Sequence, residues 1–195
     1  MGRPISLPIP RLEYKDAMER FGTDRPDTRF GLEMKDITDL VRASNFQVFK
    51  SVAESGGRIK TICVEKSASS FSRKVLDEMS QIAVSMGGKG VSSAKITEDG
   101  WQSSLDKFFS KEEKKEISRK VGASPGDMLL MMADKPKVVN QVLGMLRLEI
   151  AKRLNLIKSD VFSFVWVVKF PLLEYNEAEG RLEAVHHPFT APMEE

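Results

Sequence analysis

The sequence predicts an α+β fold, in which a compact, layered α/β domain occupies the middle of the chain and segments that form β-hairpins flank it. The first observation is the alternation of strand-like and helix-like apolar patterns between residues 33 and 157. The second is the stretch 162–175, which is rich in Val, Phe and Trp and leads through a turn into 181–185. We therefore divide the chain into segments 1–32, 33–157 and 158–195.

Composition is that of a soluble globular protein with a proper core, since 41% of the 195 residues are hydrophobic and 30% are charged. The net charge of +2 does not predict a nucleic-acid-binding protein, and it does not exclude one. Cys63 is the only cysteine, which excludes a disulfide framework and favours a reducing, cytoplasmic setting. No apolar run approaches the roughly 20 residues that span a bilayer, so we expect no membrane contact.

Two short helices are predicted in the first part of the chain. Residues 14–22 are amphipathic and end in glycine, and residues 36–45 follow Asp36 as a candidate N-cap. Between them, residues 23–33 are turn-forming and heavily charged, and Pro26 excludes a helix at that point.

The middle of the chain carries the clearest patterns. Buried or half-buried strands are predicted at 58–65, 90–97 and 127–133. A helix is predicted over 72–88 with Ser72 as its cap, and Ser110 with Glu113 predicts a capping box that opens the next helix. Asp134 and Pro136 begin the longest predicted helix, which extends to about Leu156.

The pattern of the C-terminal part predicts a β-hairpin that needs a larger sheet to join. Residues 162–175 are a long strand candidate, 176–180 form a turn and 181–185 pair back. An isolated hairpin is marginal in water. We therefore expect this part to belong to something larger.

Both histidines of the chain, His186 and His187, are adjacent in a loop that contains Pro and Phe. Consecutive side chains of an extended segment point to opposite faces, so the pair does not favour one shared metal ion. Two interpretations remain open. Either one histidine is packed and the other solvated, or both donate hydrogen bonds to an anionic substrate.

The run 110–120 mixes lysine, arginine and glutamate, which is typical of a solvated helix face. The alternative is that its cations contact an RNA backbone. We find no pattern of a Ser/His/Asp triad or of a catalytic pair of carboxylates.

Five stretches of the chain resemble bacterial-type aspartyl-tRNA synthetases, in the order of that family. They are 17–34, 87–96, 124–157, 164–175 and 186–192, and the motifs GTDRPDTR and HHPFT within them are specific. The resemblance implies that 33–157 is an inserted GAD domain, and that 1–32 and 158–195 are segments of a class II catalytic domain. It further implies an aspartate–tRNA ligase that is a homodimer. This enzyme activates L-aspartate with ATP, assisted by Mg²⁺, and transfers it to tRNA.

The resemblance also implies site residues. His186 and, beside it, His187 would bind L-aspartate, and Asp24, Arg25 and Asp27 would lie in a charged active-site loop. No catalytic residue and no metal ligand is assigned.

Other family motifs, which carry the phosphate-binding arginines, are absent from this sequence, so we expect the 195 residues alone to be inactive. Lys169 also departs from the family, which usually has an acidic residue there.

Two alternatives stand beside the ligase fragment. The GAD-like domain is either a non-catalytic module that contacts tRNA or a purely structural insertion. The flanking motifs favour the ligase, because a free-standing module has no use for them.

Overall fold

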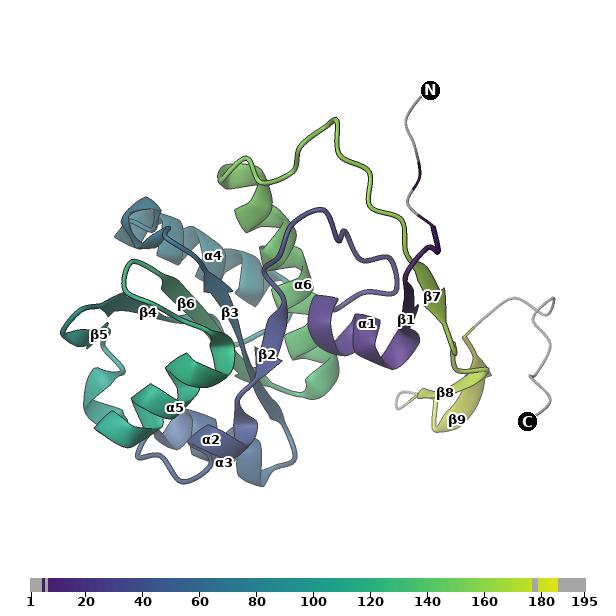
Figure 1. Cartoon of the computed structure of the whole chain (residues 1–195). Coiled ribbons are helices and arrows are strands. Elements are labelled where there is room, and N and C mark those ends of the chain that lie inside the picture. The colour runs from purple at the N-terminus through teal and green to yellow at the C-terminus, as the bar shows by residue number, and fades with distance from the viewer. Residues whose placement is uncertain (1–4, 6, 177–178, 186–195) are drawn as a thin grey trace.

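A five-stranded antiparallel sheet lies at the centre of the computed structural model, which describes residues 5, 7–176 and 179–185 (Figure 1). The strand order is β2-β3-β6-β4-β5. The strands are β2 (Met34–Asp36), β3 (Arg58–Val64), β4 (Ser92–Thr97), β5 (Gly100–Gln102) and β6 (Met128–Asp134). The described part of the chain is therefore a mixed α+β structure, as predicted, and its central sheet is wholly antiparallel.

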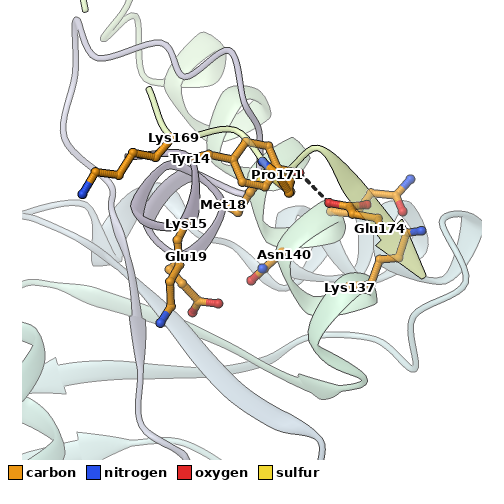
Figure 2. Close-up of a pocket in the computed structure, with 11 residues that line it drawn as sticks. Tyr14, Lys15, Met18, Glu19, Lys137, Asn140, Lys169, Pro171 and Glu174 are labelled. Atoms are coloured by element: carbon orange, nitrogen blue, oxygen red, sulfur yellow. Dashed lines mark hydrogen bonds between the residues drawn. The ribbon is translucent and has the colours of Figure 1, made fainter. Parts of the chain in front are cut away.

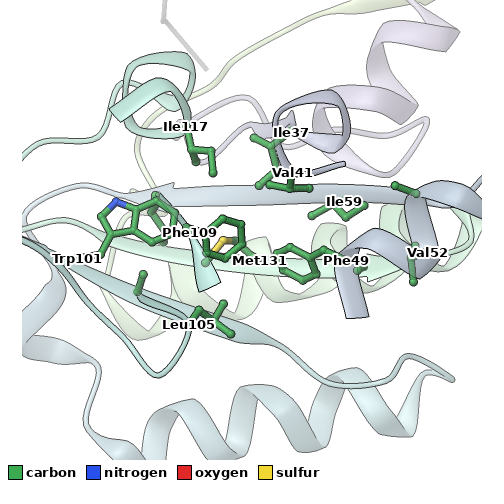
Figure 3. Close-up of a cluster of buried hydrophobic side chains, with 14 of the residues drawn as sticks. Ile37, Val41, Phe49, Val52, Ile59, Trp101, Leu105, Phe109, Ile117 and Met131 are labelled. Atoms are coloured by element: carbon green, nitrogen blue, oxygen red, sulfur yellow. The ribbon is translucent and has the colours of Figure 1, made fainter. Parts of the chain in front are cut away.

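Helices lie on both faces of this sheet. One face is covered by α2 (Thr38–Val41), α3 (Gln47–Glu54) and α5 (Lys111–Val121), and the other by α4 (Arg73–Ser85) and α6 (Pro136–Arg153). Two short 3₁₀ turns, Ala68–Ser70 and Asp106–Phe108, connect these elements. Each face of the sheet carries its own hydrophobic core under these helices. Figure 3 shows the core under α2, α3 and α5, where aromatic side chains such as Phe49, Trp101 and Phe109 meet.

The central strand β6 is buried on both sides, as its continuous apolar run predicts. Leu129 and Met131 belong to the core under α2, α3 and α5, whereas Met128 and Leu130 belong to the core under α4 and α6. Alternate residues of a strand point to opposite faces, so one strand contributes to two cores.

Helices α4 and α5 start at their predicted caps. The hydroxyl of Ser110 accepts the backbone N–H of Glu113 at 3.1 Å, and the Glu113 carboxylate accepts the N–H of Ser110 at 2.7 Å. The Ser72 hydroxyl accepts the N–H of Val75 at the start of α4. These reciprocal and single caps satisfy amide donors that an α-helix leaves unpaired at its start.

The helix predicted over 36–45 is wrong in most of its length. Asp36 ends β2, where it pairs with Lys60 of β3, and only α2 follows as a helix. The Asp36 carboxylate still accepts the N–H of Thr38 at 2.8 Å. The next helix, α3, was not predicted. Pairing of Asp36 in the sheet delays the helix, because a residue cannot satisfy both patterns.

The flanking segments pair with each other. β1 (Arg11–Glu13) and β7 (Trp166–Val168) form a parallel pair, and α1 (Tyr14–Phe21) follows β1 directly. β8 (Leu173–Asn176) and β9 (Arg181–Ala184) form the predicted hairpin. The single long strand predicted over 162–175 is wrong. The chain turns at Lys169, whose φ is +56°, and Pro171 has no N–H to continue a ladder.

Helix α1 joins the flanking strands to the central domain. Its buried residues Ala17 and Phe21 pack with Leu12 of β1, and Val167 of β7 packs against this cluster. On its other side α1 contacts α6. The face of β7 that points away from α1 exposes Trp166, whose exposed fraction is 61%. Among the described residues, no helix combines the length and the apolar character needed to cross a membrane.

Candidate functional site

The charged loop that the sequence singled out connects α1 to β2. Gly22 ends α1 in the left-handed region, with φ at +73°, and its N–H donates to the Met18 carbonyl at 3.1 Å. From there residues 23–33 run across α6 before the chain enters the sheet. The loop is therefore held between the flanking helix and the central domain.

Asp24 and Arg25 form the exposed tip of this loop. The Arg25 side chain is 91% exposed, and its Nε lies 3.6 Å from the Asp24 carboxylate. The Arg25 N–H donates to the Thr23 hydroxyl at 3.2 Å, which shapes a tight turn. These two charged groups are available to a ligand, because their mutual ion pair is weak and faces solvent.

Asp27 differs from Asp24, because its carboxylate is already occupied. Arg29 donates to both Asp27 oxygens, from Nε at 2.9 Å and from Nη2 at 2.6 Å, and the Arg29 N–H donates at 3.1 Å. These hydrogen bonds from Arg29 hold the pKa of Asp27 below its usual range. Asp27 thus orders the loop as a carboxylate at neutral pH and is unsuited to act as a general acid there.

Arg147 of α6 binds the backbone of the loop on the side that faces the central domain. A single nitrogen, Nη2, donates to the carbonyl oxygens of Asp27 at 2.6 Å, Phe30 at 3.0 Å and Gly31 at 2.9 Å. The Arg147 side chain is 1% exposed. Burial lowers its pKa to about 10, against a smaller opposite effect of Asp27.

Aromatic rings complete the surroundings of this guanidinium. Its central carbon lies 4.2 Å from the ring centroid of Phe30 and 4.8 Å from that of Phe21. Both distances are within the range of cation–π attraction. Arg147 is therefore bound by carbonyl dipoles and π-faces where a carboxylate would be the usual partner.

A second buried cation, Lys60 of β3, binds the end of α1. Its ammonium donates to the Glu19 carbonyl at 2.9 Å, to the Glu19 carboxylate and to Asn140 Oδ1 at 2.7 Å. The Lys60 side chain is 1% exposed. Three acceptors match the three N–H donors of an ammonium group, so the buried charge is fully satisfied.

A pocket of about 640 Å³ opens next to these contacts, between α1, α6 and the segment after β7 (Figure 2). Its walls carry both charged and apolar side chains. The lining residues are Tyr14, Lys15, Met18, Glu19, Gly22, Lys137, Asn140, Gln141, Lys169, Pro171 and Glu174.

On one wall of the pocket, a hydrogen bond joins the two flanking segments of the chain. The Tyr14 hydroxyl donates to Glu174 Oε1 at 2.9 Å, and its ring lies 5.1 Å from that of Phe170. Burial, followed by the bond to Glu174, raises the pKa of Tyr14 to about 12. The Tyr14 hydroxyl is thus a neutral donor at any physiological pH.

Sequence reasoning missed this pocket: of the residues predicted for the site, those that the structure describes, Asp24, Arg25 and Asp27, do not line it. The available signal was the helix 14–22, whose periodic face carries Tyr14 and Met18 toward the pocket. Lys169, the residue that departs from the synthetase pattern, does line it. Its ammonium lies 2.7 Å from the Glu13 carboxylate, so an ion pair bridges β1 and the turn after β7.

The predicted aspartate-binding residues His186 and His187 lie outside the described residues. In the described ranges, 5, 7–176 and 179–185, no three side chains of His, Cys, Asp or Glu are grouped to hold a metal ion. We therefore assign no described residue to Mg²⁺.

Comparison with known families identifies the central domain. Residues 49–143 match the GAD domain family. The chain contains a GAD domain. The matched residues include β3 with Lys60 and the first part of α6 with Asn140. Arg147 lies beyond the matched residues but on the same helix, so a continuous α6 connects the matched region to the loop.

Aspartate–tRNA ligases are among the known proteins that contain similar segments. The chain is 47% identical over its full length to the aspartate–tRNA(Asp/Asn) ligase of Desulfatibacillum aliphaticivorans, and covers 33% of that protein. It is 46% identical to the aspartate–tRNA ligase of Bacillus licheniformis, also over its full length, with 33% of that protein covered. The similarity to these relatives thus extends on both sides beyond the GAD domain, and the chain spans about a third of their length.

Proposed function

We propose that this chain is part of an aspartate–tRNA ligase, an enzyme that activates L-aspartate with ATP and transfers it to tRNA. The observation that carries the proposal is the identity of 47% over the whole chain, which includes the flanking segments and not the GAD domain alone. A module that worked without a catalytic domain would have no reason to keep 1–32 and 158–195 similar to a ligase.

In this proposal the flanking segments belong to a class II catalytic domain. The fold offers a physical reason. The parallel pair of β1 and β7 buries one face against α1, while Phe164 and Trp166 are 49% and 61% exposed. A pair of three-residue strands with an exposed apolar face is suited to join a larger sheet.

The active-site loop in the proposal contains Asp24, Arg25 and Asp27, and His186 and His187 bind L-aspartate. The loop geometry supports different roles for these charged residues. Asp24 and Arg25 present charges to solvent, whereas Asp27 is engaged by Arg29 and keeps the backbone in place. ATP, Mg²⁺, tRNA and a second subunit are partners of the ligase as a whole, and no step is assigned to them from the described residues.

The test is aspartate-dependent pyrophosphate exchange by the ligase that carries this segment. We expect His186→Ala to raise the KM for aspartate at least about tenfold, as loss of a hydrogen bond to a charged group implies. The KM for ATP should stay within about twofold. Asp39→Ala, an exposed change in α2, serves as the control. Unchanged aspartate KM in His186→Ala and His187→Ala would contradict the assignment, and absence of any exchange in the wild-type enzyme would contradict the ligase.

The 195-residue chain alone should not catalyse the exchange. A ligase needs preorganised groups at the phosphates of ATP, and such groups supply a large part of catalysis. Exchange by this chain at a rate comparable to that of the ligase would show that the site is complete within it.

The charged face of α5 keeps open a second role, contact with tRNA. Lys111, Lys115 and Lys120 are exposed, whereas Lys114 pairs with Asp106 at 2.7 Å. Gel-shift titration of the chain with tRNA across salt concentrations tests this role. Binding that falls steeply with salt favours contact with phosphates, and its absence favours a structural GAD domain.

A further inference from the structure

Two buried cations of the central domain bind the flanking segment at the two ends of one stretch. Lys60 binds Glu19 in the last turn of α1, and Arg147 binds the carbonyls of Asp27, Phe30 and Gly31. Asp24 and Arg25 lie between these two anchor points. The exposed tip of the loop therefore projects from a backbone that is bound on both sides.

The form of the Arg147 contact indicates that it orders the loop. A guanidinium in the interior is costly, and apolar residues of similar volume often stabilise a core better. Here the charge has no contacting carboxylate, and its Nε has no hydrogen-bond partner. What the charge does achieve is to draw three carbonyl oxygens, spread over Asp27 to Gly31, to one nitrogen. An apolar residue could fill the space and could not specify that loop conformation.

Backbone contact adds to this hold. Gly22, at the start of the loop, crosses α6 at Gly144, where a Cβ on Gly144 would lie 2.8 Å from the Phe21 carbonyl oxygen. Such contact leaves no slack between α1 and α6. The end of α1 and the loop that follows it are thus in direct contact with α6, so the position of the loop depends on that helix.

We propose that Arg147 is a positioning residue of the ligase, which holds the loop with Asp24 and Arg25 in its productive place. The GAD domain thereby contributes to aspartate activation without contacting a substrate. This inference rests on the proposed function for its effect on activity. Its structural half is the claim that Arg147 fixes the conformation of the loop, and this claim depends only on the observed contacts.

The structural half is tested on the 195-residue chain by limited trypsin digestion. The bond between Arg29 and Phe30 lies between the carbonyls that Arg147 binds, so its cleavage reports release of the loop. Arg147→Met should speed this cleavage at least about tenfold, which corresponds to about 1.4 kcal/mol of local opening. Arg153→Met, on the same helix as Arg147, removes ion pairs to Glu149 of α6 and to Glu78 of α4 and should change cleavage less than about twofold. Mass spectrometry assigns the cut, and circular dichroism establishes that each variant is folded.

The functional half is tested in the ligase with Arg147→Met and Arg147→Lys. We expect Arg147→Met to lower the kcat of aspartate-dependent pyrophosphate exchange at least about tenfold, with the KM for tRNA in aminoacylation within about twofold. Arg147→Lys should restore at least about half of the lost activity, because one ammonium nitrogen can donate to the same carbonyls.

The outcomes separate the two claims. Unchanged cleavage in Arg147→Met overturns the hold on the loop. Faster cleavage with unchanged kcat overturns positioning. Wild-type enzyme that charges no tRNA with aspartate overturns the proposed function, and the cleavage result stands apart from it.

Discussion

Gly22 and Gly144 meet where the end of α1 crosses α6, and neither position has room for a side chain. A Cβ on Gly144 would lie 2.8 Å from the Phe21 carbonyl oxygen and 3.3 Å from the Gly22 Cα. A Cβ on Gly22 would meet the Asn140 carbonyl, and φ at Gly22 is +73°. Close contact of two glycines lets the backbones approach, and it places the Lys60 and Arg147 contacts on either side within reach.

Gly144→Ala should destabilise the chain by about 1–3 kcal/mol, the usual cost of overpacking a tight contact. The gain of about 1 kcal/mol in helix propensity from Gly to Ala is too small to offset a clash with backbone atoms. Urea unfolding followed by circular dichroism measures the difference. Gly31→Ala is the matched control, since no atom lies within 4 Å of the position of its Cβ. Equal stability of Gly144→Ala and wild type would contradict the close contact.

The Cys63 thiol should remain protonated well above neutral pH. Burial, followed by the nearby Asp127 carboxylate at 3.6 Å, raises its pKa to about 12. A raised folded pKa stabilises the fold below the pKa of the unfolded thiol, about 8.5, and this stabilisation is lost as the pH rises toward the folded value. The free energy of unfolding of the wild type should thus fall more steeply between pH 9 and 11 than that of Cys63→Ala.

Because Cys63 is the only cysteine, alkylation measures its ionisation directly. The rate of iodoacetamide modification of the folded chain should still be rising at about pH 10, whereas the chain in denaturant should reach half its maximal rate near pH 8.5. A half-maximal rate near pH 8.5 in the folded chain would contradict the raised pKa.

Asp27→Asn should weaken the fold at neutral pH and flatten its response to acid. The hydrogen bonds from Arg29 lower the pKa of Asp27, so the carboxylate stabilises the fold above its unfolded pKa of about 4. This contribution is lost as the pH falls through the folded value. Thermal unfolding from pH 6 to 3 checks the slope. Asp39→Asn provides a control, because that side chain is 86% exposed and pairs with Arg42 at 3.7 Å.

Ser110→Ala should cost about 1 kcal/mol, the usual value for an N-cap. Glu113→Ala removes the other half of the same capping box, so the two substitutions should be less than additive in a double-mutant cycle. Glu112→Ala, in the same turn and outside the box, is the control. Strict additivity of Ser110→Ala and Glu113→Ala would show that the two bonds act independently.

Much of the central domain was predictable, because its signals are local. The capping box at Ser110 and the cap at Ser72 placed helix starts, β-branched residues after a glycine turn placed β3, and a continuous apolar run placed β6. Three strands of three residues each, β1, β2 and β5, were missed. So short a strand carries no periodicity of its own and exists through its partner.

The candidate site likewise has a part that local sequence patterns predicted and a part that they did not. Asp24, Arg25 and Asp27 were predicted as one charged loop, and they do lie in one loop. The residue that holds it, Arg147, is 120 positions from Asp27, and it reads in the sequence as one more cation on a helix. Its burial depends on what packs over α6, which no local pattern expresses.

The sequence by itself determined the helices α1, α4, α5 and α6, the caps at Ser72 and Ser110, the burial of β6 and the chain's likeness to a ligase. Tertiary structure alone decided that the sheet is antiparallel, that 162–175 breaks at Lys169 and Pro171, and that Lys60 and Arg147 are buried. Helix caps and apolar periodicity arise from neighbours within a few residues. The choice of strand partner and the burial of a charge depend on groups far apart in the chain, and only the packed fold brings these together.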